Sequence, residues 1–299
     1  MENVEVITKL VNFCVGTARL RTITVEREVG LRTLNRAQAH LYLRAPMDSL
    51  KTALLHQVAA MWNKPLPVYH HITSAGLIGS IEKSNTPSVP GAWAIRNKML
   101  ILDEFNVDGD GSCTNVLLDL LEGRAHTKKV GRECKHIDEV DGDLFWKIDD
   151  VGIHLKSRFA CVIASMHNTN KNKSDDIAAL ISRCIYYEYK LTEAQKERIS
   201  EGHDVFGLEG MKLRPPPKTG KNSPVDCLVK NVDFKHIKAV IKTSSGFDEV
   251  PNWLRLVDNC VRYYCYNGMR HDDEFYGFLT RLALENESMK FAWGIKEVR

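Results

Sequence analysis

Four apolar runs in this chain are too continuous to face solvent on one side. They cover residues 39–44, 97–105, 158–168 and 183–191. Such runs are typical of strands that are buried on both faces, as in the centre of a parallel sheet. The segments between them, such as 50–62, carry apolar side chains at helical spacing. This alternation predicts an α/β fold in which a parallel sheet is flanked by helices on both faces.

The rest of the chain divides into smaller parts. The first residues read as a helix, an extended piece at 22–25 and a basic connection. The stretch RPPPKTGKNSP, 214–224, has the composition of a linker, and two amphipathic helical patterns follow it, at 250–269 and 272–293. We therefore predict four segments, which are an N-terminal preamble 1–38, a core 39–191, a linker 192–225 and a small helical domain 226–299.

Composition and charge exclude several classes of protein. The 41 Lys and Arg against 38 Asp and Glu give a formal charge of only +3, so any contact with nucleic acid must come from a local patch. The eight cysteines form no C-x-x-C pair, which argues against a zinc ribbon or a disulfide framework. The N-terminus fails as a signal peptide, and no apolar stretch is long enough to span a membrane. We expect a reduced, cytoplasmic protein without a membrane partner.

The first apolar run leads into APMDSLKT, residues 45–52, which looks like a phosphate-binding loop that lacks its glycines. The usual form is G-x-x-x-x-G-K-[ST], in which backbone N–H groups surround phosphate oxygens, the lysine neutralises charge and the hydroxyl holds Mg²⁺. Here Ala45 and Leu50 stand at the glycine positions, and Asp48 brings a negative charge. Lys51 and Thr52 retain the charge and the hydroxyl, although a Lys-Thr pair that opens a helix is ordinary by itself.

Two carboxylates close the apolar run at 99–102. In a nucleotide site Asp103 would hold Mg²⁺ and Glu104 would activate the attacking water. An Asp-Glu pair after a core strand is by itself more often a surface turn. A Lys-Thr loop about 50 residues upstream makes the functional interpretation the stronger one.

In their order and wording these segments resemble the AAA+ core of the minichromosome maintenance (MCM) replicative helicases. The phosphate loop of that family reads GDPGTAKS, and APMDSLKT matches it in length. Four further segments match in the same order: TSAGLIGSI resembles SSAAGLTAS, GAWAIRNKMLILDEF resembles GALVLADGGVCCIDEF, RFACVIAS resembles ARCSVIAA, and LISRC resembles LLSRF. The resemblance covers residues 39–190, about half of the chain. It implies a P-loop AAA+ core with a helical C-terminal lid, and ATP and Mg²⁺ as ligands.

The resemblance also assigns roles to single residues. It implies that Arg183 reaches into the nucleotide site of a neighbouring subunit, so that the active form is a homo-oligomeric ring, in this family a hexamer. The polar residue that orients the attacking water is either His167 or Asn168, of which the amide is preferred because it donates and accepts without titrating. The implied nucleotide-binding set is Ala45, Pro46, Asp48, Ser49, Leu50, Lys51, Thr52 and Asp103, with Thr52 and Asp103 as metal ligands.

Two insertions of the family line the channel that holds DNA. The first corresponds here to IEKSNTPSVPGAW with Lys83 and Trp93, and the second to a long segment, 123–156, with a hairpin turn predicted at 141–142. The first arm of this segment is basic and suits contact with phosphates, whereas its tip is acidic and does not. Asp150 stands where the family has a lysine. Candidate DNA contacts are Lys83, Arg124, Lys128, Lys129, Arg132 and Lys135. The second sensor arginine of the lid has no clear match, because Glu274 takes its place, and Arg270 and Arg281 are the substitutes.

The function implied is an MCM-like ATPase that couples ATP hydrolysis to translocation, unwinding or remodelling of DNA. Because only about 40 residues precede the core, DNA binding would come from a partner, as in a factor of a mobile element, virus or plasmid. One alternative is a degenerate module that binds nucleotide weakly or not at all and acts as an interaction subunit. Another is an AAA+ remodeller that grips polypeptide through Trp93, Phe145 or Trp146.

Overall fold

The computed structural model of the protein describes the greater part of the chain. The described residues are 3–18, 20–27, 30–34, 36–62, 65–70, 72–81, 87–88, 99–105, 111–129, 136–140, 144–166, 174–201, 203, 206, 208, 225–229, 233–247, 254–293 and 295.

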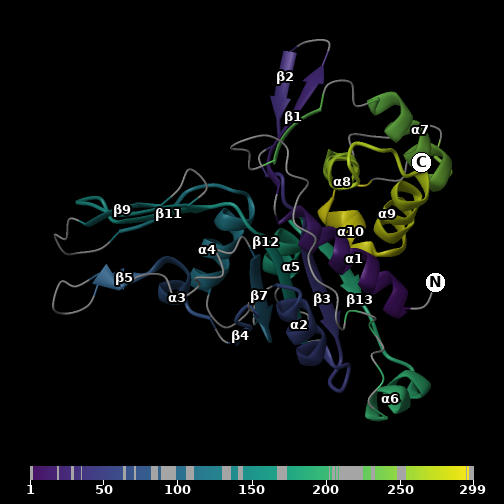
Figure 1. Ribbon diagram of the computed structural model, residues 1–299, viewed down its shortest axis with the longest axis horizontal. Coiled ribbons are helices and arrows are strands. Elements are labelled where there is room, and N and C mark those ends of the chain that lie inside the picture. The colour runs from purple at the N-terminus through teal and green to yellow at the C-terminus, as the bar shows by residue number, and fades with distance from the viewer. Residues whose placement is uncertain are drawn as a thin grey trace.

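A five-stranded parallel sheet forms the centre of the molecule (Figure 1). Its strands are β3 (His40–Ala45), β4 (Tyr69–His70), β7 (Met99–Asp103), β12 (Ala160–Met166) and β13 (Ile185–Glu188). They lie in the order β13-β3-β12-β7-β4, and every neighbouring pair is parallel. The prediction of an α/β fold with a parallel sheet flanked by helices is therefore confirmed.

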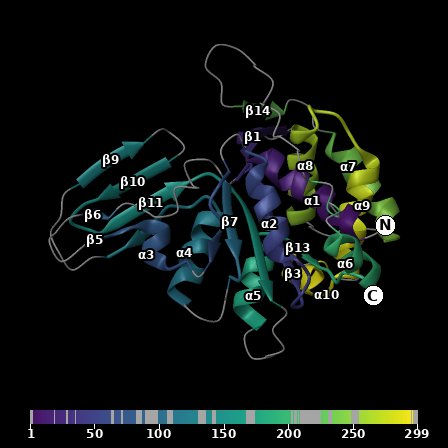
Figure 2. The same ribbon diagram turned by 60° about the horizontal axis from the view of Figure 1, so that its bottom comes forward.

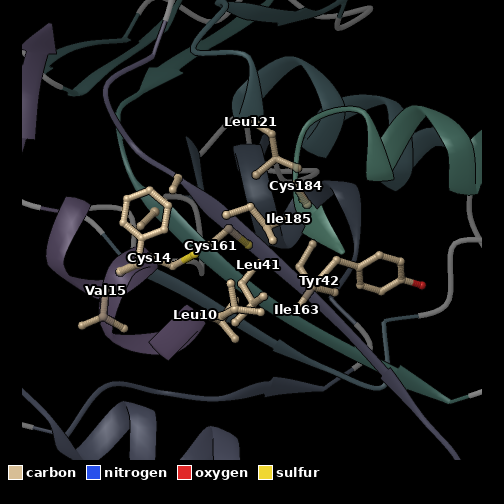
Figure 3. Close-up of a cluster of buried hydrophobic side chains, with 14 of the residues drawn as sticks. Leu10, Cys14, Val15, Leu41, Tyr42, Leu121, Cys161, Ile163, Cys184 and Ile185 are labelled. Carbon is tan, nitrogen blue, oxygen red and sulfur yellow. The ribbon is translucent and has the colours of Figure 1, made fainter. Parts of the chain in front are cut away.

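The helices that accompany the sheet follow its strands along the chain. They are α2 (Lys51–Ala60), α3 (Ser74–Ile78), α4 (Gly111–Leu121) and α5 (Ser174–Ile181). Helix α1 (Asn3–Thr17) also packs against β3 and β12, although it precedes them in the sequence. Buried side chains of α1 meet the strands in the cluster of Figure 3, which includes Leu10, Cys14, Leu41 and Cys161. The predicted preamble thus contributes to the core.

A second, three-stranded sheet joins distant parts of the chain. It contains β1 (Leu20–Arg27), β2 (Gly30–Thr33) and β14 (Val225–Val229) in the order β14-β1-β2. Strand β14 pairs in parallel with β1, and β2 pairs antiparallel with it. The extended piece predicted at 22–25 is part of β1, whereas the pairing with β14 could not be read from local patterns.

A four-stranded antiparallel sheet extends away from the centre, on the side opposite to the C-terminal helices (Figures 1 and 2). It consists of β8 (His126–Lys128), β9 (His136–Val140), β10 (Leu144–Ile148) and β11 (Ile153–Ser157), in the order β8-β11-β10-β9. The turn predicted at 141–142 falls between β9 and β10, outside the described residues. A two-stranded ribbon, β5 (Ser80–Ile81) and β6 (Pro87–Ser88), accompanies this sheet.

The C-terminal part is helical. Its helices are α7 (Phe234–Ser245), α8 (Leu254–Tyr266), α9 (Asp273–Glu285) and α10 (Glu287–Ala292). The second amphipathic pattern, predicted as one helix, is interrupted at Asn286, whose side chain accepts a hydrogen bond of 3.0 Å from the N–H of Met289 and so caps α10. None of the described helices has the length and apolar character that a bilayer crossing requires.

The segment predicted as a linker contains a further helix, α6 (Glu193–Ser200). Its first turn is closed by a reciprocal pair of hydrogen bonds, in which Thr192 N–H donates to Gln195 Oε1 and Gln195 N–H donates to Thr192 Oγ1. This is a capping box, which fixes a helix N-terminus without tertiary support. The Thr-x-x-Gln pattern of this capping box is present in the sequence, but the linker was predicted from the Pro-rich composition further along the segment.

The C-terminal helices attach to the core near the edge where the parallel strands begin. The buried guanidinium of Arg262 on α8 donates hydrogen bonds of 3.2 and 3.3 Å to the carbonyl of Arg36, shortly before β3. The indole of Trp293 donates a bond of 3.1 Å to the carbonyl of Ile181, at the end of α5. These contacts lie at the edge opposite to the one where β3 and β7 end.

Candidate functional site

The ends of β3 and β7 are joined by one short hydrogen bond. The hydroxyl of Thr52, in the first turn of α2, donates to Asp103 Oδ2 at 2.6 Å, across a sequence separation of 51 residues. Strand β12 lies between the two strands, so the bond spans the carboxyl edge of the sheet. Open α/β sheets bind their ligands at this edge. The two residues expected to hold a metal are therefore brought together.

The loop between β3 and α2 has an unusual backbone for its sequence. Asp48 and Leu50 have φ angles of 58° and 55°, in the left-handed region that normally favours glycine. Ser49, between them, turns its hydroxyl back onto the carbonyl of Pro46 at 2.7 Å. Positive φ is uncommon for residues that carry a Cβ and costs free energy, most of all for a bulky residue such as leucine. The loop thus has a backbone conformation that is energetically unfavourable for the residues at positions 48 and 50.

Lys51 closes this loop from the inside. Its Nζ donates to the carbonyls of Ala45 at 2.9 Å and Pro46 at 2.6 Å, and the residue is buried. Burial lowers the pKa of the Lys51 ammonium, while the nearby carboxylates of Asp103, Glu104 and Asp48 oppose this shift. The ammonium is held where backbone oxygens converge, beside the Thr52–Asp103 bond.

Glu104 is the third strained residue of the site. Its φ is 49°, and its N–H donates to Asp103 Oδ1 at 2.9 Å, so the buried Asp103 is bound through both oxygens. Among the described residues, four non-glycine residues have positive φ, and three of them are Asp48, Leu50 and Glu104. Strain that gathers at one place points to a site where backbone geometry matters for function.

Two residues of this site escaped the sequence analysis. His70, at the end of β4, lies with Nδ1 3.5 Å from Asp103 Oδ2. The hydroxyl of Tyr189, just after β13, donates to the carbonyl of Ser49 at 3.0 Å and so supports the loop. Both positions follow from the strand order, because β4 and β13 end at the same edge as β3 and β7. The signal available in the sequence was only a polar residue at a strand end.

The predicted water-orienting residues, His167 and Asn168, lie outside the described residues. Strand β12, which precedes them, ends between β3 and β7. Near its end the hydroxyls of Ser165 and Tyr42 are 2.8 Å apart. The choice between the two candidates stays open.

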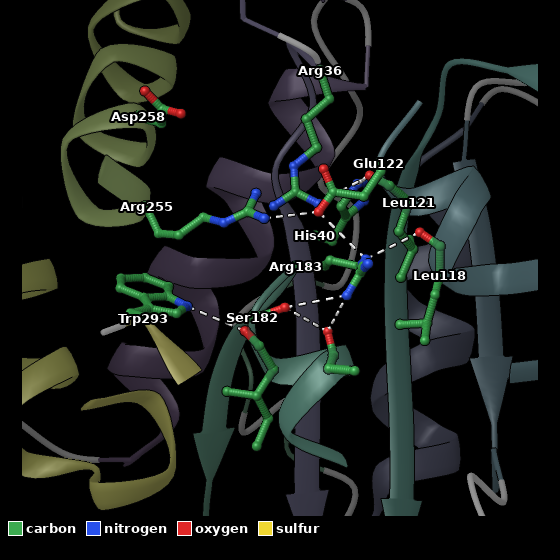
Figure 4. Close-up of polar contacts among 12 residues, drawn as sticks. Arg36, His40, Leu118, Leu121, Glu122, Ser182, Arg183, Arg255, Asp258 and Trp293 are labelled. Carbon is green, nitrogen blue, oxygen red and sulfur yellow. Dashed lines mark hydrogen bonds and ion pairs between the residues drawn. The ribbon is translucent and has the colours of Figure 1, made fainter. Parts of the chain in front are cut away.

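Arg183 lies at the opposite edge of the sheet, in the turn that precedes β13 (Figure 4). Its Nε donates to the carbonyl of Leu118 at 3.1 Å and pairs with Glu122 at 3.3 Å, and its Nη1 donates to the carbonyl of Ala179 at 2.7 Å. Arg183 therefore cannot reach the Thr52–Asp103 site of its own chain.

Glu122 is surrounded by guanidinium groups. Arg255 on α8 donates to its Oε1 at 2.9 Å, and Arg36 and Arg183 also act on its carboxylate (Figure 4). Burial alone would raise the pKa of Glu122, but these positive charges outweigh burial and hold the pKa below its ordinary value. For Arg36, burial and the nearby Arg262 lower the pKa to about 9, and its Nε is a buried donor without a partner in the described part of the chain. The cluster therefore carries excess positive charge.

The predicted DNA contacts are only partly described. Arg124, Lys128 and Lys129 are exposed in and around the edge strand β8, whereas Lys83, Arg132 and Lys135 lie outside the described residues. Asp150 lies in the turn between β10 and β11, so the hairpin tip there is acidic.

The register adds two basic residues that the sequence analysis passed over, Lys147 and Lys156. It places Lys147 beside His154, and Lys156 two residues further along the same strand as His154, so both point to one face. Trp146, on the other face, is buried and donates to the carbonyl of Ile78 at 2.8 Å. It is therefore not available to grip a polypeptide; Trp93 lies outside the described residues, and so does the side chain of Phe145.

The substitutes for the second sensor do not reach the site. Arg270 and Arg281 are exposed, in the turn before α9 and on α9. In the described contacts, Arg270 accepts a bond from Asn267 through its carbonyl, and Arg281 lies beside Gly277. The helices that carry them attach at the far edge of the sheet, so a lid over the loop at 45–52 stays a prediction.

Within the described residues, no group of three His, Cys, Asp or Glu side chains is arranged to hold a metal ion. The sequence matches no family model, and a search of curated proteins finds no match either. Local geometry therefore carries the functional argument.

Proposed function

We propose that the loop at 45–52 binds a magnesium–nucleoside triphosphate and that the chain hydrolyses it, as a module similar to the motor core of MCM helicases. The observation that carries this proposal is the bond between Thr52 and Asp103. A hydroxyl and a carboxylate from segments far apart in sequence meet at the carboxyl edge of the sheet, next to a buried lysine. This combination is what phosphate-bound Mg²⁺ requires of a protein.

The residues present fit a magnesium ion. Thr52 and Asp103 both offer oxygen atoms as ligands. Mg²⁺ is typically held by one or two protein oxygens, with phosphate and water completing its coordination shell. Thr52 and Asp103 would hold the ion, which when bound neutralises phosphate charge.

The other residues of the loop bind and position. Lys51 already points at two carbonyl oxygens, and phosphate oxygens are stronger acceptors for the same ammonium. The left-handed residues Asp48 and Leu50 turn the backbone toward the N-terminus of α2, whose free N–H groups favour an anion. Glu104, exposed beside Asp103, would take a proton from the attacking water.

The wider proposal is a ring that moves or remodels DNA, with hydrolysis at contacts between subunits. The position of Arg183 supports it. This arginine lies at the edge of the sheet opposite to the Thr52–Asp103 site, so a catalytic role for it requires the site of another subunit. Exposed Lys128 and Lys129 support a contact with phosphate backbone. A separate DNA-binding partner remains part of the proposal, as does location in the cytoplasm.

One alternative has an observation of its own. The loop has left-handed backbone angles at Asp48 and Leu50 without glycine there, which lowers the stability of the fold, and Asp48 repels phosphate. The loop would then persist as a structural element of an interaction subunit that does not hydrolyse nucleotide. The meeting of Lys51, Thr52 and Asp103 at one edge of the sheet favours the first proposal.

Direct binding separates these two. Calorimetric titration of the protein with Mg-ATP should show saturable binding, and Lys51→Ala should abolish it. Glu104→Gln should bind ATP as the parent does and lower turnover about a hundredfold, because only the proton acceptor is lost. Lys238→Ala on α7 removes one exposed lysine and is the control for the change in net charge. Absence of binding by the parent protein would leave the structural alternative.

A further inference from the structure

The antiparallel sheet places a hydroxyl, an imidazole and a carboxylate in one hydrogen-bonded series. In the register of β8 and β11, Thr127 stands directly opposite His154, and Thr127 Oγ1 lies 2.9 Å from His154 Nδ1. The other ring nitrogen, Nε2, lies 2.8 Å from Oδ1 of Asp149, which is in the turn between β10 and β11. The sheet extends on the side of the molecule opposite to the C-terminal helices (Figures 1 and 2).

Asp149 is fixed at its end of the series. Its Oδ1 also accepts hydrogen bonds from the N–H groups of Val151 at 3.0 Å and Gly152 at 3.2 Å, and its Oδ2 lies 2.9 Å from Lys147 Nζ. Hydrogen bonds from Lys147 and His154 hold the pKa of the Asp149 carboxyl below its ordinary value, so it is ionised at neutral pH. Because an ionised carboxylate can only accept, neutral His154 carries its proton on Nε2.

This tautomer decides what the second ring nitrogen can do. A neutral imidazole that is protonated on Nε2 has a lone pair on Nδ1, so the hydroxyl of Thr127 donates to Nδ1. A hydroxyl, a base within hydrogen-bond reach and a third group that orients the base form the arrangement by which enzymes activate a nucleophile. Thr127 is exposed, whereas the side chains of His154 and Asp149 are only 19% and 21% exposed. The hydroxyl is therefore the member of the series that a substrate meets.

Positive charge surrounds this hydroxyl. The exposed Lys156 lies two residues from His154 on the same face of β11, which is the diagonal position to Thr127 and within reach of a long side chain. Two more exposed lysines, Lys128 and Lys129, follow Thr127 directly. These charges attract an anionic substrate. Since water also reaches an exposed site and competes with the hydroxyl, the substrate must also carry a leaving group that departs readily. An acyl phosphate has both properties.

We propose that Thr127 is a nucleophile that takes an acyl group from a small acyl phosphate, with His154 as its base and Asp149 as the residue that positions the base. The oxygen of Thr127 attacks the carbonyl carbon, and the hydroxyl proton passes to Nδ1 of His154. The bond between this carbon and the phosphate oxygen breaks, and the phosphate leaves with the bonding electrons and receives the proton from His154. The products are an ester on Thr127 and free phosphate. Water then releases the acyl group as a carboxylic acid, with His154 again as the base.

Acetyl phosphate is the probe that tests this proposal. After incubation of the full chain, mass spectrometry should find an acetyl group on the peptide that contains Thr127, and phosphate release should exceed the spontaneous rate. Hydroxylamine should remove the group, because it cleaves an ester and leaves acetyl-lysine intact. Thr127→Ser should retain both signals, whereas Thr127→Val should lose both. Thr33→Val is the matched control, because Thr33 is also an exposed strand threonine but its hydroxyl faces that of Thr24, and it should react as the parent does.

The base and its positioning residue have separate readouts. His154→Asn keeps a hydrogen-bond acceptor but cannot take up a proton, so the rate of acetylation should fall about a hundredfold or more. Asp149→Asn should lower the rate as well, because the tautomer of His154 is no longer fixed. Nitrogen NMR of the imidazole should show the proton on Nε2 in the parent and a population with the proton on Nδ1 in Asp149→Asn. A purely structural role for Asp149 would leave the tautomer unchanged.

The opposite results would overturn the proposal. It is wrong if the parent shows neither an ester on Thr127 nor more phosphate release than Thr127→Val, or if His154→Asn reacts as fast as the parent. It is also wrong if His154 of the parent carries its proton on Nδ1, because Thr127 then has no base. Each of these results leaves the nucleotide site untouched, since Thr127→Val and His154→Asn should bind Mg-ATP as the parent does.

Discussion

The hydroxyl of Thr52 lies 2.6 Å from a carboxylate oxygen of Asp103, although 51 residues separate the two in the sequence. The bond forms because β3 and β7 are second neighbours in a parallel sheet and both end at the same edge. A hydroxyl donor and a buried carboxylate acceptor stabilise each other in the absence of a cation, and the same oxygens can bind one.

A substitution at this bond should uncouple magnesium from nucleotide. Asp103→Asn keeps an acceptor for Thr52 but loses the negative charge, so nucleotide affinity with Mg²⁺ should fall about tenfold or more, while affinity in EDTA should not fall, because a charge that repels phosphate is removed. Thr52→Ser keeps the hydroxyl and is the matched control. Titration of a fluorescent nucleotide with and without Mg²⁺ measures both; an equal Mg²⁺ dependence in Asp103→Asn and parent would remove Asp103 as a ligand.

The left-handed conformation of Asp48 predicts a difference between two substitutions. Asp48 is exposed, so its replacement changes few contacts, and both Asp48→Gly and Asp48→Ala remove the same charge. Only glycine is at ease at a φ of 58°, so Asp48→Gly should be more stable than Asp48→Ala by about 1 kcal/mol in urea denaturation. Both should bind nucleotide more tightly than the parent at low salt. Equal stabilities would show that the loop leaves this conformation in solution.

The sequence was sufficient to predict the elements that a local pattern of side chains determines. The runs at 39–44 and 97–105 became β3 and β7 because continuous apolar side chains can be buried only in the middle of the sheet. The lysine and hydroxyl that open α2, and the carboxylate that ends β7, could be placed in one site because parallel strands share an edge.

Other features depend on partners far away in the chain. Strand β14 is a strand because it pairs with β1, about 200 residues earlier, which no local pattern encodes. Tyr189 and His70 belong to the site through strand order alone, and Glu122 is explained only by the arginines that fold around it. The left-handed conformation of Leu50 was visible in the sequence only as a missing glycine.

The arginine cluster predicts how stability responds to acid. The pKa of Glu122 in the folded protein lies below its ordinary value of 4.5, so its ionised form stabilises the fold above that pH, and the contribution is lost as pH falls through the folded-state pKa. Glu122→Gln should therefore cost about 3 kcal/mol at pH 7, the scale of breaking a buried ion pair, and progressively less below pH 4.5. Urea denaturation of both proteins from pH 3 to 7 measures the difference. If the difference in the free energy of unfolding between the two proteins does not change with pH, ionisation of Glu122 does not stabilise the fold.

The exposed lysines at the end of β8 predict the salt dependence of DNA binding. Lys128 ends β8, an edge strand of the antiparallel sheet, and Lys129 follows it. This sheet extends on the side opposite to the C-terminal helices (Figures 1 and 2). If they contact phosphates, replacing both by alanine should weaken binding of single-stranded DNA and flatten the plot of log affinity against log salt by roughly 0.7 to 0.9 for each lost contact. Lys235→Ala with Lys238→Ala, on the exposed face of α7, removes the same charge at the other end of the molecule and should leave the slope unchanged. Fluorescence anisotropy over a range of salt concentrations measures the slopes. If both double variants flatten the slope equally, only net charge matters and β8 does not contact DNA.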